Sequence, residues 1–122
     1  LAMATITLLS CGGAETPSDI TKKVFTSLEN ENYDYIIDKL ANQGEKLADE
    51  DREKLKKMFA MSKGQLDAKQ GIKSITIKSE TISEDGNSCA VEAEIEYNNG
   101  DKEPATSNFI KENNEWKISI GQ

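Results

Sequence analysis

The chain has 122 residues, no histidine and a formal net charge of -7 at pH 7. Its length fits a single domain with one hydrophobic core. The acidic balance disfavours nucleic acid as a partner, because nucleic-acid binding depends on cationic contacts to phosphate, and it also disfavours spreading on anionic lipid.

The N-terminal ten residues predict a lipid-modified N-terminus. Residues 1–10 carry no charge and are mostly apolar or small, which is typical of the hydrophobic part of a signal peptide and too short to span a bilayer. They lead into Leu8-Leu9-Ser10-Cys11-Gly12, a pattern typical of a bacterial lipobox. We therefore predict that 1–10 is a signal-peptide remnant and that Cys11 is the lipid attachment site. Since no basic residue precedes Lys22, we expect that a few residues before Leu1 are missing.

The alternative is a buried N-terminal segment in which Cys11 is a small apolar side chain. If Cys11 instead carries lipid, Cys89 has no disulfide partner in the chain. We then expect Cys89 to be a buried structural residue, because a reactive thiol needs a nearby cation or histidine. Residues 11–15 are predicted to be the lipidated cysteine and a tether, and residues 16–122 a single domain.

Two helices are expected first. One begins with Thr16 as its cap and Pro17 in its first turn, and its apolar residues, spaced by four, continue to about Glu29. A shorter helix follows, with Asn32 as its cap. Its apolar face is predicted to contain Tyr33, Ile36, Ile37 and Leu40.

A third helix is expected to start in the acidic turn Asp49-Glu50-Asp51. Gly64 could end or kink it, and Gly71 is a plausible final stop. Its buried face is predicted to contain Leu55, Met58, Phe59 and Leu66.

From Ile72 the apolar period changes from helical to two, which predicts strands. A first strand ends near Ile82. The next has the clearest pattern in the chain, with Cys89, Val91, Ala93, Ile95 and Tyr97 alternating with Ala90, Glu92, Glu94 and Glu96. A third strand runs from about Lys102 to Lys111, with Pro104 at an edge or a bulge. The last carries Trp116, Ile118 and Ile120.

This order of elements predicts an α+β fold, with about three N-terminal helices packed on a curved four-stranded antiparallel meander. The segment Ser18–Leu40, with its break before Asn32-Tyr33-Asp34-Tyr35, resembles the opening of nuclear-transport-factor-2-like domains. The stretch Cys89–Ile120, with a hairpin at Gly100 and Trp116-Lys117-Ile118 near its end, is similar to small bacterial lipoproteins of a domain-of-unknown-function family in that superfamily, which is also compared with SnoaL-like, lumazine-binding-like and cystatin-like folds.

The resemblance implies a cone in which the sheet wraps around the helices and whose mouth can form a pocket. Enzymes of this superfamily place Asp, His or Tyr inside it, whereas the inward positions here are almost all apolar. The candidate pocket-lining residues are Tyr33, Tyr97, Phe109 and Trp116. They could line a site for a small hydrophobic ligand, and ordinary core packing is the alternative.

Two groups of polar residues are candidate chemical sites. Glu92, Glu94 and Glu96 share one strand face, but such side chains stand about 7 Å apart, so we expect a solvated face paired with Lys73 or Lys78. Tyr33-Asp34-Tyr35 could support acid–base chemistry, and its helix position favours a structural role. We assign no catalytic residue, no metal site and no cofactor.

These observations predict a lipid-anchored, non-enzymatic protein of the bacterial cell envelope that acts through binding or assembly. Because Gly12 follows the cysteine, we expect the outer membrane, facing the periplasm. Its partners would be the membrane, through the lipid, and a small hydrophobic ligand or an envelope protein. A small-ligand carrier is the alternative, and a pocket enzyme is a third option. Assembly predicts an exposed apolar patch or a free strand edge near Pro104.

Overall fold

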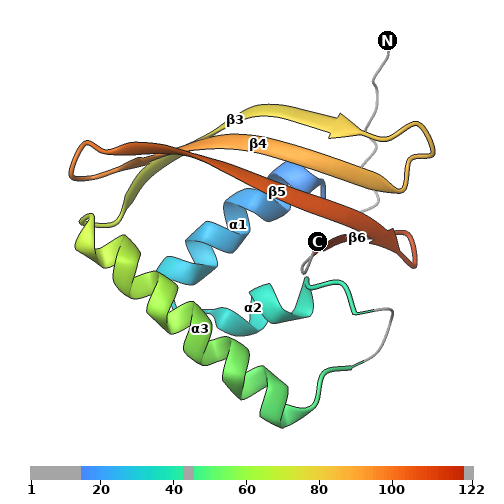
Figure 1. Cartoon of the computed structure of the whole chain (residues 1–122), viewed down its shortest axis with the longest axis horizontal. Helices are drawn as coiled ribbons and strands as arrows, with labels where there is room; N and C mark the ends of the chain where they lie inside the picture. Colours follow the sequence, from blue (N-terminus) through green and yellow to red (C-terminus); the bar gives the residue numbers. More distant parts are fainter. Residues whose placement is uncertain (1–14, 43–45, 120–122) are drawn as a thin grey trace.

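The computed structural model describes residues 15–42 and 46–119, so the expectations for Cys11 and Ile120 lie outside the described residues. The elements are three helices followed by four strands: α1 (Pro17–Glu29), α2 (Tyr33–Asp38), α3 (Asp49–Ala68), β3 (Ile72–Ile82), β4 (Ser88–Tyr97), β5 (Lys102–Glu112) and β6 (Glu115–Ile118). The strands form an antiparallel sheet in the order β3-β4-β5-β6 (Figure 1). The predicted α+β meander is confirmed.

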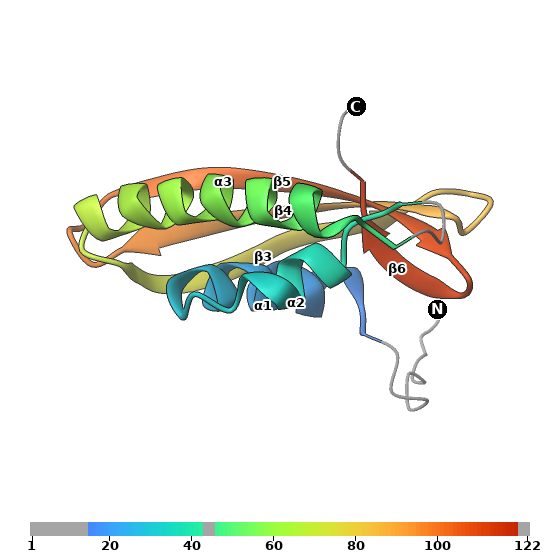
Figure 2. The same ribbon diagram turned by 90° about the horizontal axis from the view of Figure 1, so that it is seen from below.

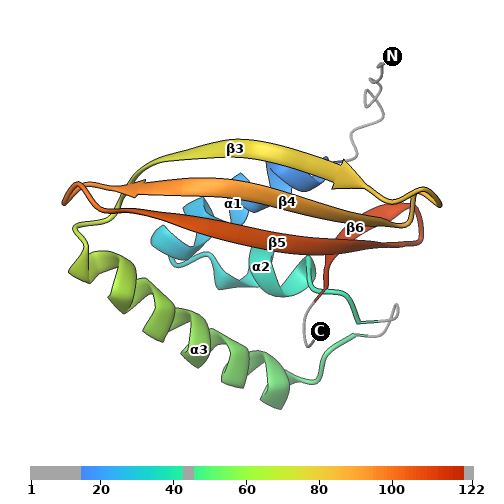
Figure 3. The same cartoon turned by 45° about the horizontal axis from the view of Figure 1, so that its top comes forward.

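The helices cover one face of the sheet. Helices α1 and α2 lie beneath its β3 side, and α3 lies beneath its β4–β5 side (Figure 2). Helix α3 packs mainly on α1 and α2, and it diverges from the sheet towards its N-terminal end (Figure 3). None of the helices in residues 15–42 and 46–119 is long and apolar enough to cross a membrane.

The start of α1 is fixed by two sets of hydrogen bonds. The Thr16 hydroxyl accepts from the backbone N–H of Asp19 at 3.1 Å, as predicted for an N-cap, and Pro17 opens the helix. The backbone N–H and hydroxyl of Ser18 both donate to Glu80 of β3, at 3.1 and 2.6 Å. A carboxylate from the sheet therefore sits at the positive end of the α1 dipole.

Residue Glu15, expected to be part of the tether, packs onto the folded domain instead. Its carboxylate pairs with Lys23 at 2.6 Å and Lys39 at 2.5 Å and accepts a hydrogen bond from the Tyr35 hydroxyl at 3.1 Å. Burial acts to raise the pKa of Glu15, but the lysines and Tyr35 outweigh it and lower that pKa to about 2. The described fold thus includes the residue before the expected boundary at 16.

Helix α2 begins where predicted and ends earlier than predicted. Asn32 occupies the N-cap position, although its side chain makes no capping hydrogen bond, and its backbone N–H donates to the Ser27 carbonyl at 2.8 Å. The helix ends at Asp38, so Leu40 lies beyond it. There Leu40 is buried and bridges to Ile118, which connects the end of α2 to β6.

The predicted buried face of α3 is wrong at Met58, which is 59% exposed. Phe59 is the residue that packs inward, with its ring centroid 6.1 Å from that of Tyr33 on α2. Because consecutive helical residues are about 100° apart around the axis, a helix that turns Phe59 towards α2 turns Met58 away from it.

Glycines mark the end of α3 but not its interior. The helix continues through Gly64 to Ala68, so the predicted break at Gly64 does not occur. Gly71 closes the helix, because its backbone N–H donates to the Leu66 carbonyl at 2.9 Å while its φ is +84°.

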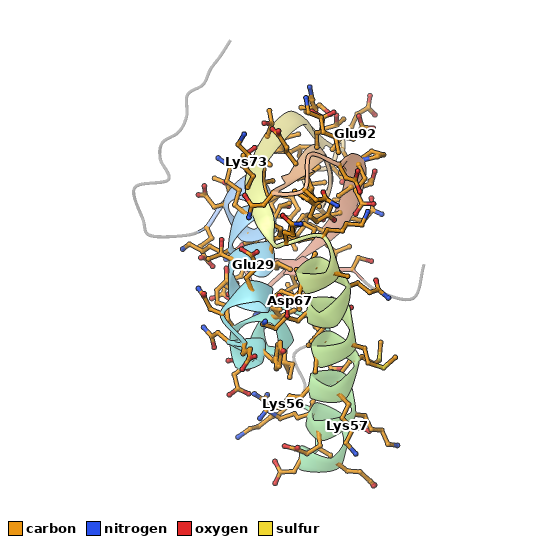
Figure 4. All side chains as sticks on the ribbon, turned by 90° about the vertical axis from the view of Figure 1, so that its left-hand side faces the viewer. Glu29, Lys56, Lys57, Asp67, Lys73 and Glu92 are labelled. Atoms are coloured by element: carbon orange, nitrogen blue, oxygen red, sulfur yellow. The ribbon has the colours of Figure 1, made fainter. Side chains whose placement is uncertain are left out.

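Strand β4 has one buried and one polar face, as its alternation predicts. Its inward residues are at most 4% exposed: Cys89, Val91, Ala93, Ile95 and Tyr97. On the outer face, Lys78 lies 4.0 Å from Glu94 and Lys73 lies 3.8 Å from Glu96, so the predicted lysine pairing is confirmed. Lys73 and Glu92 project from the side of the sheet that the helices do not cover (Figure 4).

The core is formed by two neighbouring clusters between the helices and the sheet. The first contains Leu28, Ile36, Leu66, Ile95 and Tyr97. The second contains Ile20, Cys89, Val91 and Phe109. Cys89 is a free, buried thiol, and burial raises its pKa to about 11, which fits the structural role expected for it.

Part of β5 has an open edge. Strand β6 pairs with residues 109–112 of β5, and the N–H of Ser119 donates to the Asn108 carbonyl at 2.8 Å. Among the described residues, this leaves 102–107 without a strand partner on that side. The backbone N–H of Tyr97 donates to the Asp101 carbonyl at 2.8 Å, and by alternation the backbone nitrogen of Pro104 then faces the open edge. Proline costs no ladder hydrogen bond there, so its predicted edge position agrees with the structure.

Candidate functional site

A groove of about 330 Å³ lies between the C-terminal half of α3 and strands β4 and β5. Its wall is apolar on the α1 side and at its floor, and its polar side chains stand at the rim. We call it the α3–β5 groove, and it is lined by Phe25, Leu28, Ser62, Gln65, Leu66, Lys69, Ile95, Tyr97, Glu103, Pro104 and Ala105.

The groove lies where α3 packs mainly on the other helices and meets the sheet only near its C-terminal end. Arg52 of α3 reaches Asp34 at 2.9 Å and Asp38 at 3.3 Å, both on α2. The Tyr33–Phe59 ring contact joins the same two helices. These contacts direct one side of α3 towards α2, while the side that carries Ser62 and Gln65 lines the open groove.

On the sheet side, the groove is lined by Ile95 and Tyr97 of β4 and by Glu103, Pro104 and Ala105 of β5. The Ala105 side chain is a single methyl group, which leaves space between β5 and α3. Ile95 is paired with Glu103. Strand register thus places one carboxylate, that of Glu103, on the same face as the buried residues of β4.

The polar end of the groove is built around Tyr97. Its hydroxyl donates a short hydrogen bond to the Glu103 carboxylate. The ammonium of Lys69 stands 5.0 Å from the centre of the Tyr97 ring and 3.6 Å from Asp101. Burial, followed by the hydrogen bond to Glu103 and its negative charge, raises the pKa of Tyr97 to about 12. The phenol is therefore protonated at neutral pH.

Backbone hydrogen bonds fix this end of the groove. The N–H of Asn98 donates to the Gly71 carbonyl at 2.9 Å, and its side-chain amide donates to the Gln70 carbonyl at 2.8 Å. The Glu29 carboxylate accepts from the N–H of Ile72 at 2.6 Å. The end of α3, which carries Lys69, is thus connected to the β4–β5 turn.

The four predicted pocket residues do not surround one cavity. Tyr97 lines the α3–β5 groove. Tyr33 packs against Phe59 between α2 and α3. Phe109 is 1% exposed in the second core cluster, and Trp116 packs against that cluster from β6. Phe109 also borders a separate hollow of about 420 Å³ at the other end of the sheet.

The candidate acid–base residues Tyr33, Asp34 and Tyr35 do not converge. The carboxylate of Asp34 is exposed and pairs with Arg52 at 2.9 Å and Lys56 at 3.5 Å, and the hydrogen bond from Arg52 is the main cause that lowers its pKa. Tyr35 donates to Glu15. Within residues 15–42 and 46–119, no group of three or more His, Cys, Asp or Glu side chains is arranged to hold a metal ion.

Sequence reasoning missed Lys69 and Glu103. A signal for Glu103 was present, because it shares the strand parity of Phe109 and therefore falls on the inward face of β5. A charged residue at an inward strand position is the kind of exception that indicates a polar site. Lys69 gave no such signal, since its position depends on where α3 ends relative to the hairpin.

The sequence profile of the family described as "Domain of unknown function (DUF4878)" matches residues 9–119. A nuclear-transport-factor-2-like protein from Campylobacter jejuni, whose name proposes it to be a transpeptidase, superposes with a TM-score of 0.73 at 18% identity, covering 88% of this chain and 100% of its own. A SEC-C-motif protein from Rhodopseudomonas palustris superposes with a TM-score of 0.54 at 13% identity, covering 88% and 77%. No curated protein matches the sequence.

Proposed function

Since the chain belongs to this family of unknown function and has a nuclear-transport-factor-2-like fold, we propose that it is a lipid-anchored, non-enzymatic binding protein of the bacterial cell envelope. Its binding site is the α3–β5 groove, which holds the apolar part of a small ligand.

The groove itself is the observation that carries this proposal. Ligand sites are typically concave, mostly apolar and about 300–1,000 Å³ in volume, with a few placed polar groups. The α3–β5 groove has a volume of about 330 Å³ and places Tyr97, Glu103 and Lys69 at one end of an apolar wall. Its size suits a short aliphatic chain or one aromatic ring.

A binding role is supported over a catalytic one by the state of these polar groups. The Tyr97 hydroxyl, with its pKa raised to about 12, cannot act as a base or a nucleophile at neutral pH. Its proton is directed at Glu103. The Tyr97 hydroxyl thus holds the Glu103 carboxylate in place.

Lipid anchoring is supported by the lipobox residues 8–12. The ion pairs of Glu15 add to this, because they attach the chain to the domain shortly after Cys11. The proposed location is the outer membrane, facing the periplasm. Cys11→Ala should abolish incorporation of labelled palmitate and move the protein from the membrane fraction to the soluble one. A variant that stayed in the membrane fraction would contradict the anchor.

The groove is tested by filling it. The neutral probe 1-octanol, which has a short aliphatic chain, should bind the Cys11→Ala chain in titration calorimetry. Ala105→Phe, which places a ring in the groove, should lower the affinity at least about tenfold. Thr106→Phe is the matched control, since Thr106 is exposed on the other face of the same strand. If Ala105→Phe and Thr106→Phe bound the probe with equal affinity, the probe would bind outside the α3–β5 groove.

Assembly with another protein is the second candidate. Met58 and Met61 of α3 are 59% and 72% exposed, and within the described residues β5 has its open edge over 102–107. Exposed methionines are common on surfaces that bind proteins, because their side chains adapt to different partners. Sedimentation of the full chain distinguishes the candidates: an assembly protein should self-associate or bind a partner in a manner that Met61→Glu abolishes and Ala105→Phe does not.

A further inference from the structure

The charge distribution at the α3–β5 groove indicates which ligands it selects. The Glu103 carboxylate lies at the groove and accepts a hydrogen bond from Tyr97 through Oε1. In the part of the chain that the structure describes, no lysine or arginine forms an ion pair with it, whereas Glu94 and Glu96 on the outer face of β4 each have a lysine partner. Glu103 thus presents a negative charge that the protein orients but does not neutralise.

The lysine that lines the groove, Lys69, is engaged elsewhere. The Lys69 ammonium is 3.6 Å from Asp101 and lies over the Tyr97 ring at 5.0 Å. An anionic ligand would have to draw Lys69 away from both contacts and would also meet Glu103. A cationic ligand requires neither change, and the formal net charge of -7 favours its approach at long range.

The apolar wall begins beside this carboxylate. Leu66 of α3 and Ile95 of β4 both belong to the first core cluster and both line the groove, together with the half-buried Phe25 of α1. A ligand whose charge rests at Glu103 can therefore lay an apolar chain along these residues. The groove is complementary to an amphipathic molecule with a charged head and a short apolar body.

We propose that the α3–β5 groove selects amphipathic amines: an ammonium group pairs with the free oxygen of Glu103, and the apolar part of the molecule lies against Phe25, Leu66 and Ile95. Tyr97 is a positioning residue that fixes the other carboxylate oxygen. This inference rests on the proposed function, because it names the class of ligand for the same groove.

Three probes of equal chain length test the inference: 1-octylamine, which is an ammonium ion at neutral pH, 1-octanol and octanoate. In titration calorimetry with the Cys11→Ala chain, octylamine should bind about tenfold more tightly than octanol, and octanoate should bind more weakly than octanol. Added salt should weaken octylamine binding and leave octanol binding unchanged, because only the amine forms an ion pair.

Glu103→Gln keeps the hydrogen-bond acceptor for Tyr97 and removes the charge. In this variant octylamine and octanol should bind with about equal affinity, and the affinity for octanol should be unchanged. Glu94→Gln is the control, since it removes one carboxylate from the outer face of the sheet, and it should leave the preference intact.

The failures of the two proposals are distinguishable. If octylamine and octanol bind equally to the unsubstituted groove, and both lose affinity in Ala105→Phe, the groove binds ligands but does not select amines. A preference that survives Glu103→Gln would also overturn the inference. If none of the three probes binds, the proposed function itself fails.

Discussion

Gly71 lies where α3 turns into β3, and adding a single methyl group there should lower the stability of the fold. Its φ is +84°, and a Cβ added there would lie 3.2 Å from the Glu29 carboxylate and 3.4 Å from the Asn98 amide. An L-residue in the left-handed region costs about 1–2 kcal/mol. The Glu29 carboxylate accepts a hydrogen bond from the N–H of Ile72 at 2.6 Å. Because the added Cβ would displace Glu29, losing this hydrogen bond adds about 1–2 kcal/mol to the loss of stability. Gly71→Ala should therefore lower the free energy of unfolding by about 2–4 kcal/mol.

Two other glycines separate these contributions. Gly86 also has a positive φ, +75°, but an added Cβ would meet no atom within 4 Å, so Gly86→Ala should cost only the conformational part, about 1–2 kcal/mol. Gly64 lies within α3 with open space around it, and Gly64→Ala should raise stability by about 0.5–1 kcal/mol. Urea unfolding followed by circular dichroism measures all three. If Gly71→Ala lost no more stability than Gly86→Ala, the close packing of Glu29 against the turn would be refuted.

Further predictions concern titration and core packing. Glu15→Gln should cost about 1 kcal/mol at pH 7, a figure limited by solvent screening. Because the Glu15 pKa is lowered from 4.5 to about 2, this cost should be complete above pH 4.5 and vanish as the pH falls towards 2; a deficit that did not change with pH would contradict the ion pairs. The near-ultraviolet difference between the unsubstituted chain and Tyr97→Phe after a rapid pH jump should have its midpoint near pH 12, and one near 10 would mean that Tyr97 is not perturbed. Phe109→Ala, at a residue 1% exposed, should cost about 3–5 kcal/mol in urea unfolding, whereas Ile82→Ala, at 49% exposure, should cost less than about 1 kcal/mol; equal losses would argue against the second core cluster.

The elements that could be predicted from the sequence are those with a strong local pattern. The alternation of β4 from Cys89 to Tyr97 indicated both its extent and its buried face, because side chains of period two can face one core in only one register. The cap at Thr16 likewise located the start of α1, since that hydrogen bond is made within one turn.

The features that sequence reasoning missed depend on contacts between elements. Nothing local to α3 shows that it packs on α2 through Arg52 and Phe59 and leaves Met58 exposed. The groove follows from that packing. Of the four candidate pocket residues, Tyr97 lines the groove and Tyr33, Phe109 and Trp116 do not. Phe109 was correctly predicted to face inward, but the core fills the space around it on the helix side.

Contacts made by the helical turns on either side of Gly64 explain why α3 does not end at this glycine. A glycine lowers helix stability by about 1 kcal/mol relative to alanine, which is too little to break a helix whose flanking turns are held by neighbours. Lys63 pairs with Asp67 at 2.8 Å across this glycine, and Leu66 is buried in the first core cluster. A tertiary contact thus overrides a weak local preference.

Native mass spectrometry of the full chain purified from the envelope of its own cells tests most directly whether the α3–β5 groove binds a small ligand. Besides any lipid joined covalently to the chain, the protein should carry a non-covalently bound mass of a few hundred daltons at most, a size set by the groove of about 330 Å³. This mass should be absent from Ala105→Phe but present in Thr106→Phe. A native protein that carries no non-covalent mass, or one that Ala105→Phe retains, would contradict a ligand site in the groove.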